Sequence, residues 1–215
     1  MKSLIKLYLI IIGVFALIFA FVNLTGLLSV SDIKEYLHQI QDTDKLKIFI
    51  VVAILLASDV FLSVPTILIV TYSGNILGFE LGLLASTLGM LISGSIAYIL
   101  CRMTGDKTLK FLIKDPKEID EVNNIFHKMG FGMLIIARAL PMLPEATCCL
   151  SGMMKFNFIK FILYYLIGTL PYAIVLTYLG SISDLDNPYP ALIGIGVVYI
   201  ILYTLWFFKL RSKND

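Results

Sequence analysis

The sequence contains few charged residues for its length. Aspartate, glutamate, lysine and arginine make up 15% of the 215 residues, whereas hydrophobic residues make up 59%. A soluble domain of this size needs a far more polar surface, and a mean hydropathy of +0.91 is typical of an integral membrane protein. The formal net charge of +2 gives no indication of a nucleic-acid partner, and we expect none.

Histidine is also scarce, which excludes several kinds of active site. His38 and His127 both lie in polar stretches, so no histidine in the apolar segments can pair with a nucleophilic serine. The sequence has no HExxH zinc motif, no Walker loop and no GxGxxG fingerprint. We therefore expect neither enzymatic activity nor a bound metal or cofactor.

Cysteine is represented by three residues, Cys101, Cys148 and Cys149, all in apolar surroundings. An odd count with two adjacent members argues against a disulfide framework. The pattern predicts small buried hydrophobic side chains.

The apolar segments predict an all-α protein that crosses the membrane several times. Residues 4–28 follow Lys2 and Lys6 and have no signal-peptidase site after them, so we interpret them as an uncleaved first transmembrane helix. Residues 31–47 are polar and predict either an interfacial helix or a solvated loop helix. Further apolar segments cover 48–103, 129–154, 156–180 and 191–208.

The distribution of charge predicts that both termini lie in the cytoplasm. If 48–80 and 129–154 each enter the membrane and return, most lysines and arginines outside the apolar segments fall on the inner side. The turn at 181–190 would then lie outside, and it contains no lysine or arginine. Six full crossings give the same end points. Charge alone therefore does not separate four spans with two re-entrant hairpins from six spans.

Two interrupted apolar segments share one pattern about 79 residues apart. In each, a charged residue precedes a proline by six positions, and a glycine and an aromatic residue follow. The first copy contains Asp59, Pro65, Gly74 and Phe79, and the second contains Arg138, Pro144, Gly152 and Phe156. Proline breaks helical hydrogen bonds, and such a break is tolerated in a membrane only inside protein or beside water. Paired interrupted segments therefore predict a transport site between two repeats, although chance similarity of apolar segments is the alternative.

The charged residues in these segments are the candidate site. Arg138 is costly at membrane depth unless it is paired, and Asp59 is its natural partner. A purely structural ion pair is the competing interpretation. Glu145 would begin a restarted helix, as a ligand or as a simple cap. Glu80 would contribute to the site or lie at the membrane interface.

A ladder of small residues lies within the apolar segment 48–103. Gly74, Gly78, Gly82 and Ser86 are spaced by four, which predicts one helical face that another helix can approach closely.

Two stretches resemble the DedA, or VTT-domain, membrane proteins, also called SNARE-associated Golgi protein homologues. The first is "SGNILGFELGLLASTLGMLISGSIAYILCRMTG", which ends in Tyr98, Arg102 and Gly105. The second is "RALPMLPEATCCLSGMMKFNFIKF", with Arg138, Pro141 and Pro144. The similarity covers roughly residues 50–180. It implies two opposed re-entrant helical hairpins and the translocation of phospholipids or of undecaprenyl phosphate.

The sequence also departs from the family pattern. Thr66 and Ile67 stand where many members carry a second acid, and Pro144 stands where many carry a second arginine. These differences place the chain closer to the VTT branch than to DedA proper. They leave the lipid and any proton coupling open.

The combined prediction is an all-α integral membrane protein with about four transmembrane helices and two opposed re-entrant hairpins. Residues 1–47 form an N-terminal helix and interfacial segment, 48–180 the core, and 181–215 a last helix with a basic tail. We expect a flippase- or scramblase-like transporter of the plasma membrane, whose partners are lipids with anionic phosphate head groups. A proton- or cation-coupled transporter of small solutes and a structural membrane protein are the alternatives.

Overall fold

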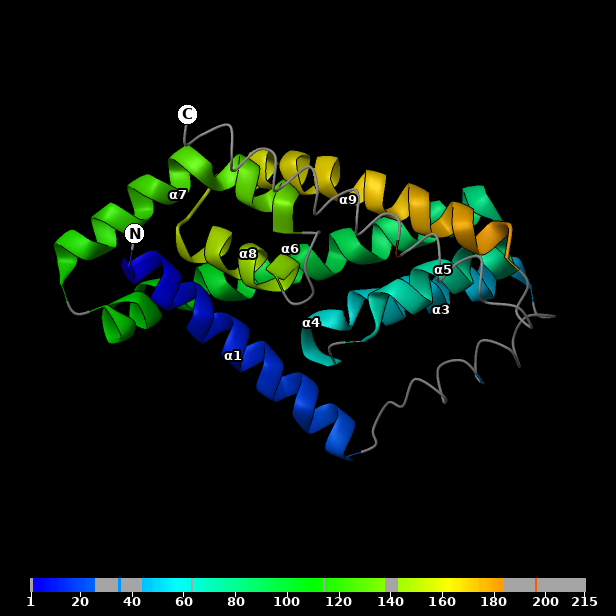
Figure 1. Cartoon of the computed structure of the whole chain (residues 1–215), viewed down its shortest axis with the longest axis horizontal. Coiled ribbons are helices and arrows are strands. Elements are labelled where there is room, and N and C mark those ends of the chain that lie inside the picture. Colours follow the sequence, from blue (N-terminus) through cyan, green and yellow to red (C-terminus); the bar gives the residue numbers. More distant parts are fainter. Residues whose placement is uncertain are drawn as a thin grey trace.

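The computed structural model describes residues 2–25, 35, 44–62, 64–113, 115–137, 143–183 and 196. Every regular element in these ranges is a helix (Figure 1), as the sequence predicts. In chain order they are α1 (Lys2–Thr25), α3 (Lys45–Ala57), α4 (Asp59–Leu62), α5 (Thr66–Leu77), α6 (Phe79–Leu112), α7 (Pro116–Ile136), α8 (Leu143–Met153) and α9 (Phe158–Ser181).

Polar residues set the starts of three helices. Asp44 before α3, Asp115 before α7 and Asn157 before α9 each accept a hydrogen bond from a backbone N–H in the first turn. Pro116 begins α7, where its missing N–H removes no helical hydrogen bond. These caps fix where the apolar helices begin.

The prolines of the two interrupted segments lie at helix breaks. Pro65 directly precedes α5, after the single turn of α4. Pro144 lies in the first turn of α8. Both positions suit a residue that cannot donate a backbone hydrogen bond. The predicted interruption of both apolar segments is therefore confirmed.

The two halves repeat in structure as well as in sequence. Helix α6 begins at Phe79 and α9 at Phe158, 79 positions apart, the same offset as between Pro65 and Pro144. Phe158, rather than the predicted Phe156, is therefore the counterpart of Phe79. The halves also exchange their short helices, because α5 packs against α9 and α8 packs against α6.

A glycine allows each of these exchanged crossings. A Cβ on Gly74 of α5 would overlap the backbone of Thr177 in α9. A Cβ on Gly152 of α8 would likewise overlap the backbone of Tyr98 in α6. Gly152 follows Gly74 by 78 positions, and Thr177 follows Tyr98 by 79. The same helix crossing is therefore built twice, whereas the inverted orientation in a bilayer stays a prediction.

The ladder of small residues does not form one helical face, so that prediction is wrong. Gly78 has a φ of 82° and lies between α5 and α6, where a left-handed conformation ends one helix and starts the next. Gly74 and Gly82 consequently lie on different helices. A Cβ on Gly82 would lie 2.7 Å from the Ser73 carbonyl oxygen, and the Ser73 and Ser86 hydroxyls are 2.7 Å apart. The small residues pack α6 back onto α5.

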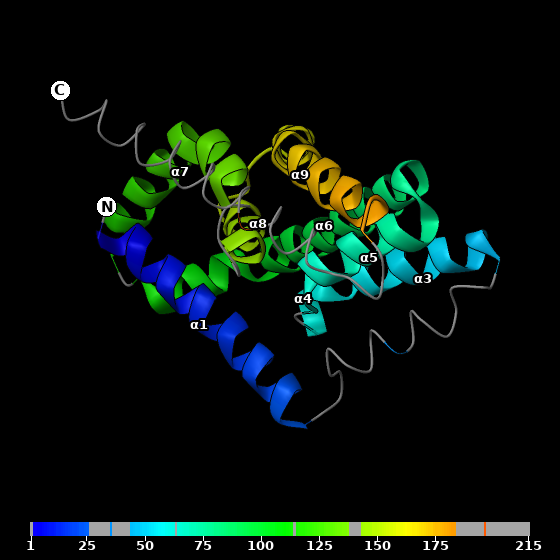
Figure 2. The same cartoon turned by 45° about the vertical axis from the view of Figure 1, so that its right-hand side comes forward.

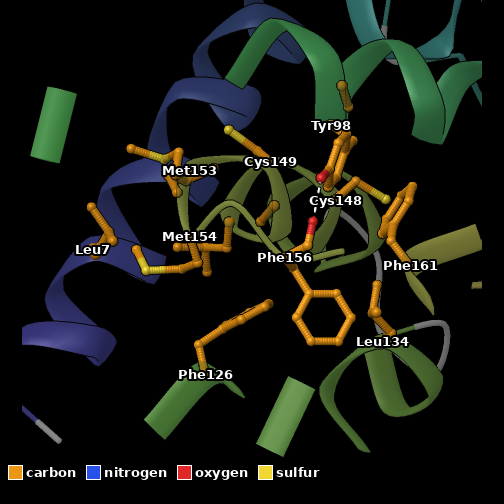
Figure 3. Packing of buried hydrophobic residues seen from close by; sticks show 14 of the residues in the cluster. Leu7, Tyr98, Phe126, Leu134, Cys148, Cys149, Met153, Met154, Phe156 and Phe161 are labelled. Carbon is orange, nitrogen blue, oxygen red and sulfur yellow. Dashed lines mark hydrogen bonds between the residues drawn. The ribbon is translucent and has the colours of Figure 1, made fainter. Parts of the chain in front are cut away.

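In the part of the chain that the structure describes, the buried apolar residues form two clusters, and α6 and α9 contribute to both. The first cluster joins them to α1, α4, α7 and α8, and Figure 3 shows its centre around Tyr98, Phe156 and Phe161. The second cluster joins α6 and α9 to α3 and α5. In Figures 1 and 2, α4 and α8 lie beside α1, and α3 and α5 lie toward the opposite end.

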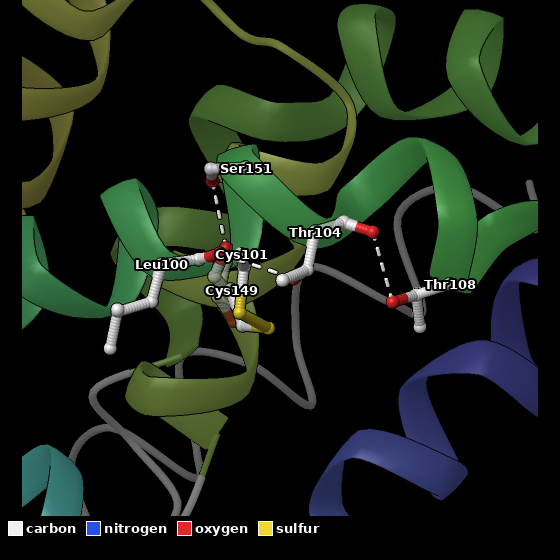
Figure 4. The surroundings of a disulfide bond; sticks show 7 residues. Leu100, Cys101, Thr104, Thr108, Cys149 and Ser151 are labelled. Carbon is white, nitrogen blue, oxygen red and sulfur yellow. Dashed lines mark hydrogen bonds between the residues drawn. A yellow bond between two sulfur atoms is a disulfide. The ribbon is translucent and has the colours of Figure 1, made fainter.

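A disulfide joins Cys101 of α6 to Cys149 of α8, so the expectation of three unlinked cysteines is wrong (Figure 4). The two Cα atoms are 5.1 Å apart, although the residues are separated by 48 positions. Only the crossing of α8 over α6 brings them together, and sequence spacing does not reveal that crossing. Cys148 is buried and is not disulfide-bonded, as the sequence predicts.

Two described helices are long and apolar enough to cross a membrane. They comprise Phe79–Gly105 within α6 and Phe158–Ser181, each with a mean hydropathy of 1.8. Helix α1 covers most of the predicted first span. The predicted last span, 191–208, lies outside the described residues. The four-span layout therefore stays a prediction.

Candidate functional site

Asp59 begins the single turn of α4 and is buried, with 7% of its surface exposed. This turn follows the end of α3 and packs against α1 and α6. The next residue, Val60, belongs to the apolar cluster that also contains Leu7 of α1 and Ala146 of α8. The sequence therefore places a carboxyl group inside the protein where the helix is interrupted.

Glu145 lies in the first turn of α8, as predicted for a helix that restarts after a proline. Its Oε2 atom is buried and has no hydrogen-bond partner. A buried polar atom without a partner is unfavourable, and it marks a place where a ligand, a proton or water would be stabilised.

Tyr8 and Thr147 are two members of this neighbourhood that the sequence analysis did not identify. The Tyr8 hydroxyl of α1 is hydrogen-bonded to the Thr147 hydroxyl of α8, two residues after Glu145. The Glu145 carboxyl group is close enough to act electrostatically on Tyr8. The only signal in the sequence is a tyrosine within an apolar helix, and tyrosine is common there.

The other end of α8 is held by the motif residues Tyr98, Arg102 and Gly105 of α6. The Tyr98 hydroxyl donates a hydrogen bond to the Phe156 carbonyl oxygen (Figure 3). Arg102 donates to the Tyr98 hydroxyl, and its Nη1 lies 3.3 Å from the same carbonyl. A Cβ on Gly105 would lie 2.8 Å from the Cα of Met153. These contacts position α8 against α6.

Glu80 does not join this neighbourhood. It is exposed in the first turn of α6, at the end of the molecule where α9 finishes. The rings of Phe79 and Tyr178 are 6.2 Å apart there, whereas α4 and α8 lie beside α1 (Figure 1). This position favours the interfacial interpretation of Glu80.

Arg138 and Pro141 lie outside the described residues, so the pairing of Asp59 with Arg138 stays a prediction. Ala137, the last described residue before them, is buried. Within the described ranges, no group of three or more histidine, cysteine, aspartate or glutamate side chains could hold a metal ion.

Comparisons with known proteins give a consistent match. The family model described as "VTT domain" matches residues 64–182, which include both α5 and α8. The chain is 27% identical over 158 residues to "Undecaprenyl phosphate transporter A" of Bacillus subtilis (strain 168), covering 65% of this chain and 80% of that protein. It is 25% identical over 195 residues to "Alkaline phosphatase-like protein" of Lactococcus lactis subsp. cremoris (strain MG1363), covering 80% and 91%. No solved structure gives a significant match.

Proposed function

The chain belongs to the VTT-domain family of membrane transport proteins, and from this we propose that it moves the phosphate-bearing head group of a membrane lipid across the bilayer. The observation that carries the proposal is the family match, which covers Pro65 with α5 and Pro144 with α8. The similarity to a protein named as an undecaprenyl phosphate transporter supports a lipid phosphate as cargo.

The candidate residues have chemistry suited to this task. The guanidinium of Arg138 forms two parallel hydrogen bonds with a phosphate group, which a lysine cannot do. The buried carboxyl group of Asp59 balances that positive charge when no lipid is bound. Glu145 supplies a second acceptor at the start of α8. The head group crosses between the interrupted segments while its acyl chains remain in the bilayer.

The proposal includes a location and an orientation. The excess of lysine and arginine in the segments assigned to the inner side supports a plasma membrane protein with cytoplasmic termini. Protonation of the buried Asp59 carboxyl group during the cycle would couple transport to protons.

Reconstitution into liposomes tests the function directly. Liposomes carry a fluorescent phospholipid or a fluorescent polyprenyl phosphate, and a membrane-impermeant quencher measures how fast the inner-leaflet label reaches the outside. We expect the wild-type protein to accelerate this exchange for at least one of the two lipids. Exchange equal to that of protein-free liposomes for both lipids contradicts the proposal, and uptake of a soluble solute instead would favour a small-solute transporter.

Variants at Arg138 test the proposed phosphate contact. We expect Arg138→Lys to impair exchange nearly as much as Arg138→Ala, because lysine keeps the charge but lacks the planar fork. Arg211→Ala, which removes an arginine from the C-terminal tail, is the matched control and should retain exchange. Full activity of Arg138→Lys would show that bidentate phosphate binding is the wrong account.

A further inference from the structure

Helix α1 lies outside the region matched by the family model, yet it packs directly against α8. Its buried residues Leu7, Ile11 and Phe15 belong to the same apolar cluster as Ala146 and Leu150 of α8. This packing leaves the polar hydroxyl of Tyr8 facing the first turns of α8. A helix that the family pattern does not include therefore reaches the candidate site.

The hydrogen bonds at this contact have a defined direction. Thr147 is fully buried, and its hydroxyl donates to the Leu143 carbonyl oxygen at 2.6 Å. A threonine hydroxyl has only one proton to donate, so in the bond between Tyr8 and Thr147 the tyrosine is the donor. Tyr8, Thr147 and Leu143 therefore form a chain from α1 to the first residue of α8.

This chain determines what remains free beside it. The only proton of the Tyr8 hydroxyl is directed to Thr147, so it is not available to Glu145. The buried Oε2 of Glu145, two residues before Thr147, keeps its acceptor capacity unused. The hydroxyl groups of Tyr8 and Thr147 are thus bonded to each other, whereas Oε2 of the nearby Glu145 carboxyl group has no hydrogen-bond partner.

We propose that Tyr8 is a positioning residue of the head-group site: through Thr147 it fixes the first turn of α8 and holds the Glu145 carboxyl group as an open acceptor for an N–H or O–H group of the transported lipid. This inference rests on the proposed function. It adds α1 to the site and assigns to Glu145 the recognition of a donor group rather than of the phosphate.

Cys148 provides a test that does not depend on transport. It directly follows Thr147, is buried, and is the described cysteine that is not part of the disulfide. The Tyr8→Phe change removes only the hydroxyl, and loss of one buried hydrogen bond corresponds to roughly a three- to tenfold more frequent local opening. We expect the rate of Cys148 alkylation by a membrane-permeant maleimide, measured by peptide mass, to rise by about that factor.

Two comparisons separate positioning from a general loss of packing. Tyr165→Phe removes another buried tyrosine hydroxyl, one that donates to the Met90 carbonyl oxygen of α6 at 3.1 Å, and should leave the alkylation rate unchanged. Thr147→Ser keeps the hydroxyl and should resemble the wild type, whereas Thr147→Val should resemble Tyr8→Phe. Equal alkylation rates in Tyr8→Phe and the wild type, or an equal rise in Tyr165→Phe, overturn the proposal.

The transport assay supplies the second measurement. Tyr8→Phe and Glu145→Gln should each raise the lipid concentration at half-maximal exchange. The double variant should be no worse than Glu145→Gln alone, because both changes act through one group. Additive effects, or a change in maximal rate with unchanged half-saturation, overturn the proposal. Wild-type protein without lipid exchange would instead contradict the proposed function, and the alkylation rates would still decide the role of Tyr8.

A lipid whose amine or hydroxyl has been methylated shows which donor group Glu145 accepts.

Discussion

At the scale of single residues, Asp59 stands out because a carboxyl group is rarely buried in a largely apolar protein. An ionised group in such surroundings requires an opposite charge or several hydrogen bonds. Asp59 has an interaction partner in the structure, and the sequence repeat makes Arg138 the candidate. The question at this scale is whether the two charges depend on each other.

The predicted pair gives opposite expectations for stability and for transport. Asp59→Asn should lower the melting temperature in detergent, because leaving one member of a buried pair alone costs about 3–5 kcal/mol. Combining it with Arg138→Gln should restore much of the stability, since no lone charge remains, but should not restore lipid exchange. Recovery of both properties would make the pair purely structural, and recovery of neither would mean that the residues are not partners.

At the scale of helices, the exchanged crossings depend on close approach of backbones. Gly74 and Gly152 lie where a methyl group has no room, and both contacts involve the rigid backbone of the opposite helix. The long helices α6 and α9 therefore hold the short helices α8 and α5 at one fixed separation. Substitutions at these two glycines act on the arrangement of whole helices.

Gly152→Ala tests this close packing. The added methyl group overlaps the Tyr98 carbonyl oxygen, and we expect a loss of roughly 1–3 kcal/mol of unfolding free energy, as in overpacked cores. Gly132→Ala in α7 is the control, because a Cβ there meets nothing within 4 Å and alanine favours a helix by roughly 0.5–1 kcal/mol. Melting curves in one detergent compare them. A neutral Gly152→Ala would mean that α8 lies farther from α6.

The disulfide adds a covalent link to the crossing of α6 and α8. Its removal by the double change Cys101→Ser and Cys149→Ser should lower the unfolding free energy by about 2–5 kcal/mol. Before that comparison, thiol titration of the denatured wild type should find one free thiol without reductant and three with it. Three free thiols without reductant would show that the cysteines are not linked in the purified protein.

At the scale of the whole molecule, α6 and α9 contribute to both apolar clusters and are the two described helices that are long and apolar enough to cross a membrane. The short helices of the interrupted segments pack against these long helices, α5 against both and α8 against α6. Such an arrangement suits hairpins that enter the membrane and return, because a broken helix then has protein on the side that faces away from lipid.

Accessible cysteines introduced at four positions test this layout. We expect residues 47 and 81 to be labelled from one side of the membrane, and the exposed residues 128 and 155 to share a side with each other. The double change of Cys101 and Cys149 to serine, with Cys148→Ala, supplies the background without native thiols. Labelling of either pair from opposite sides would replace the hairpin in that segment with a full crossing.

The sequence by itself determined the features that depend on local chemistry. The excess of apolar residues predicted membrane helices, and the prolines predicted the breaks before α5 and in α8, because proline lacks a backbone donor wherever it occurs. The offset of about 79 residues between the two interrupted segments was also visible, because matching residue types recur at that spacing. The position of Glu145 in a first turn followed from the proline beside it.

Only the tertiary structure decided which helices meet. The exchange that packs α5 on α9 and α8 on α6 places Cys101 beside Cys149, and the packing of α1 on α8 places Tyr8 beside Thr147. Gly78 looked like one step of a helical ladder, but its left-handed backbone divides α5 from α6. These outcomes depend on contacts between residues distant in the chain. Such contacts are selected by the packing of all the helices together, and no local pattern of residues encodes them.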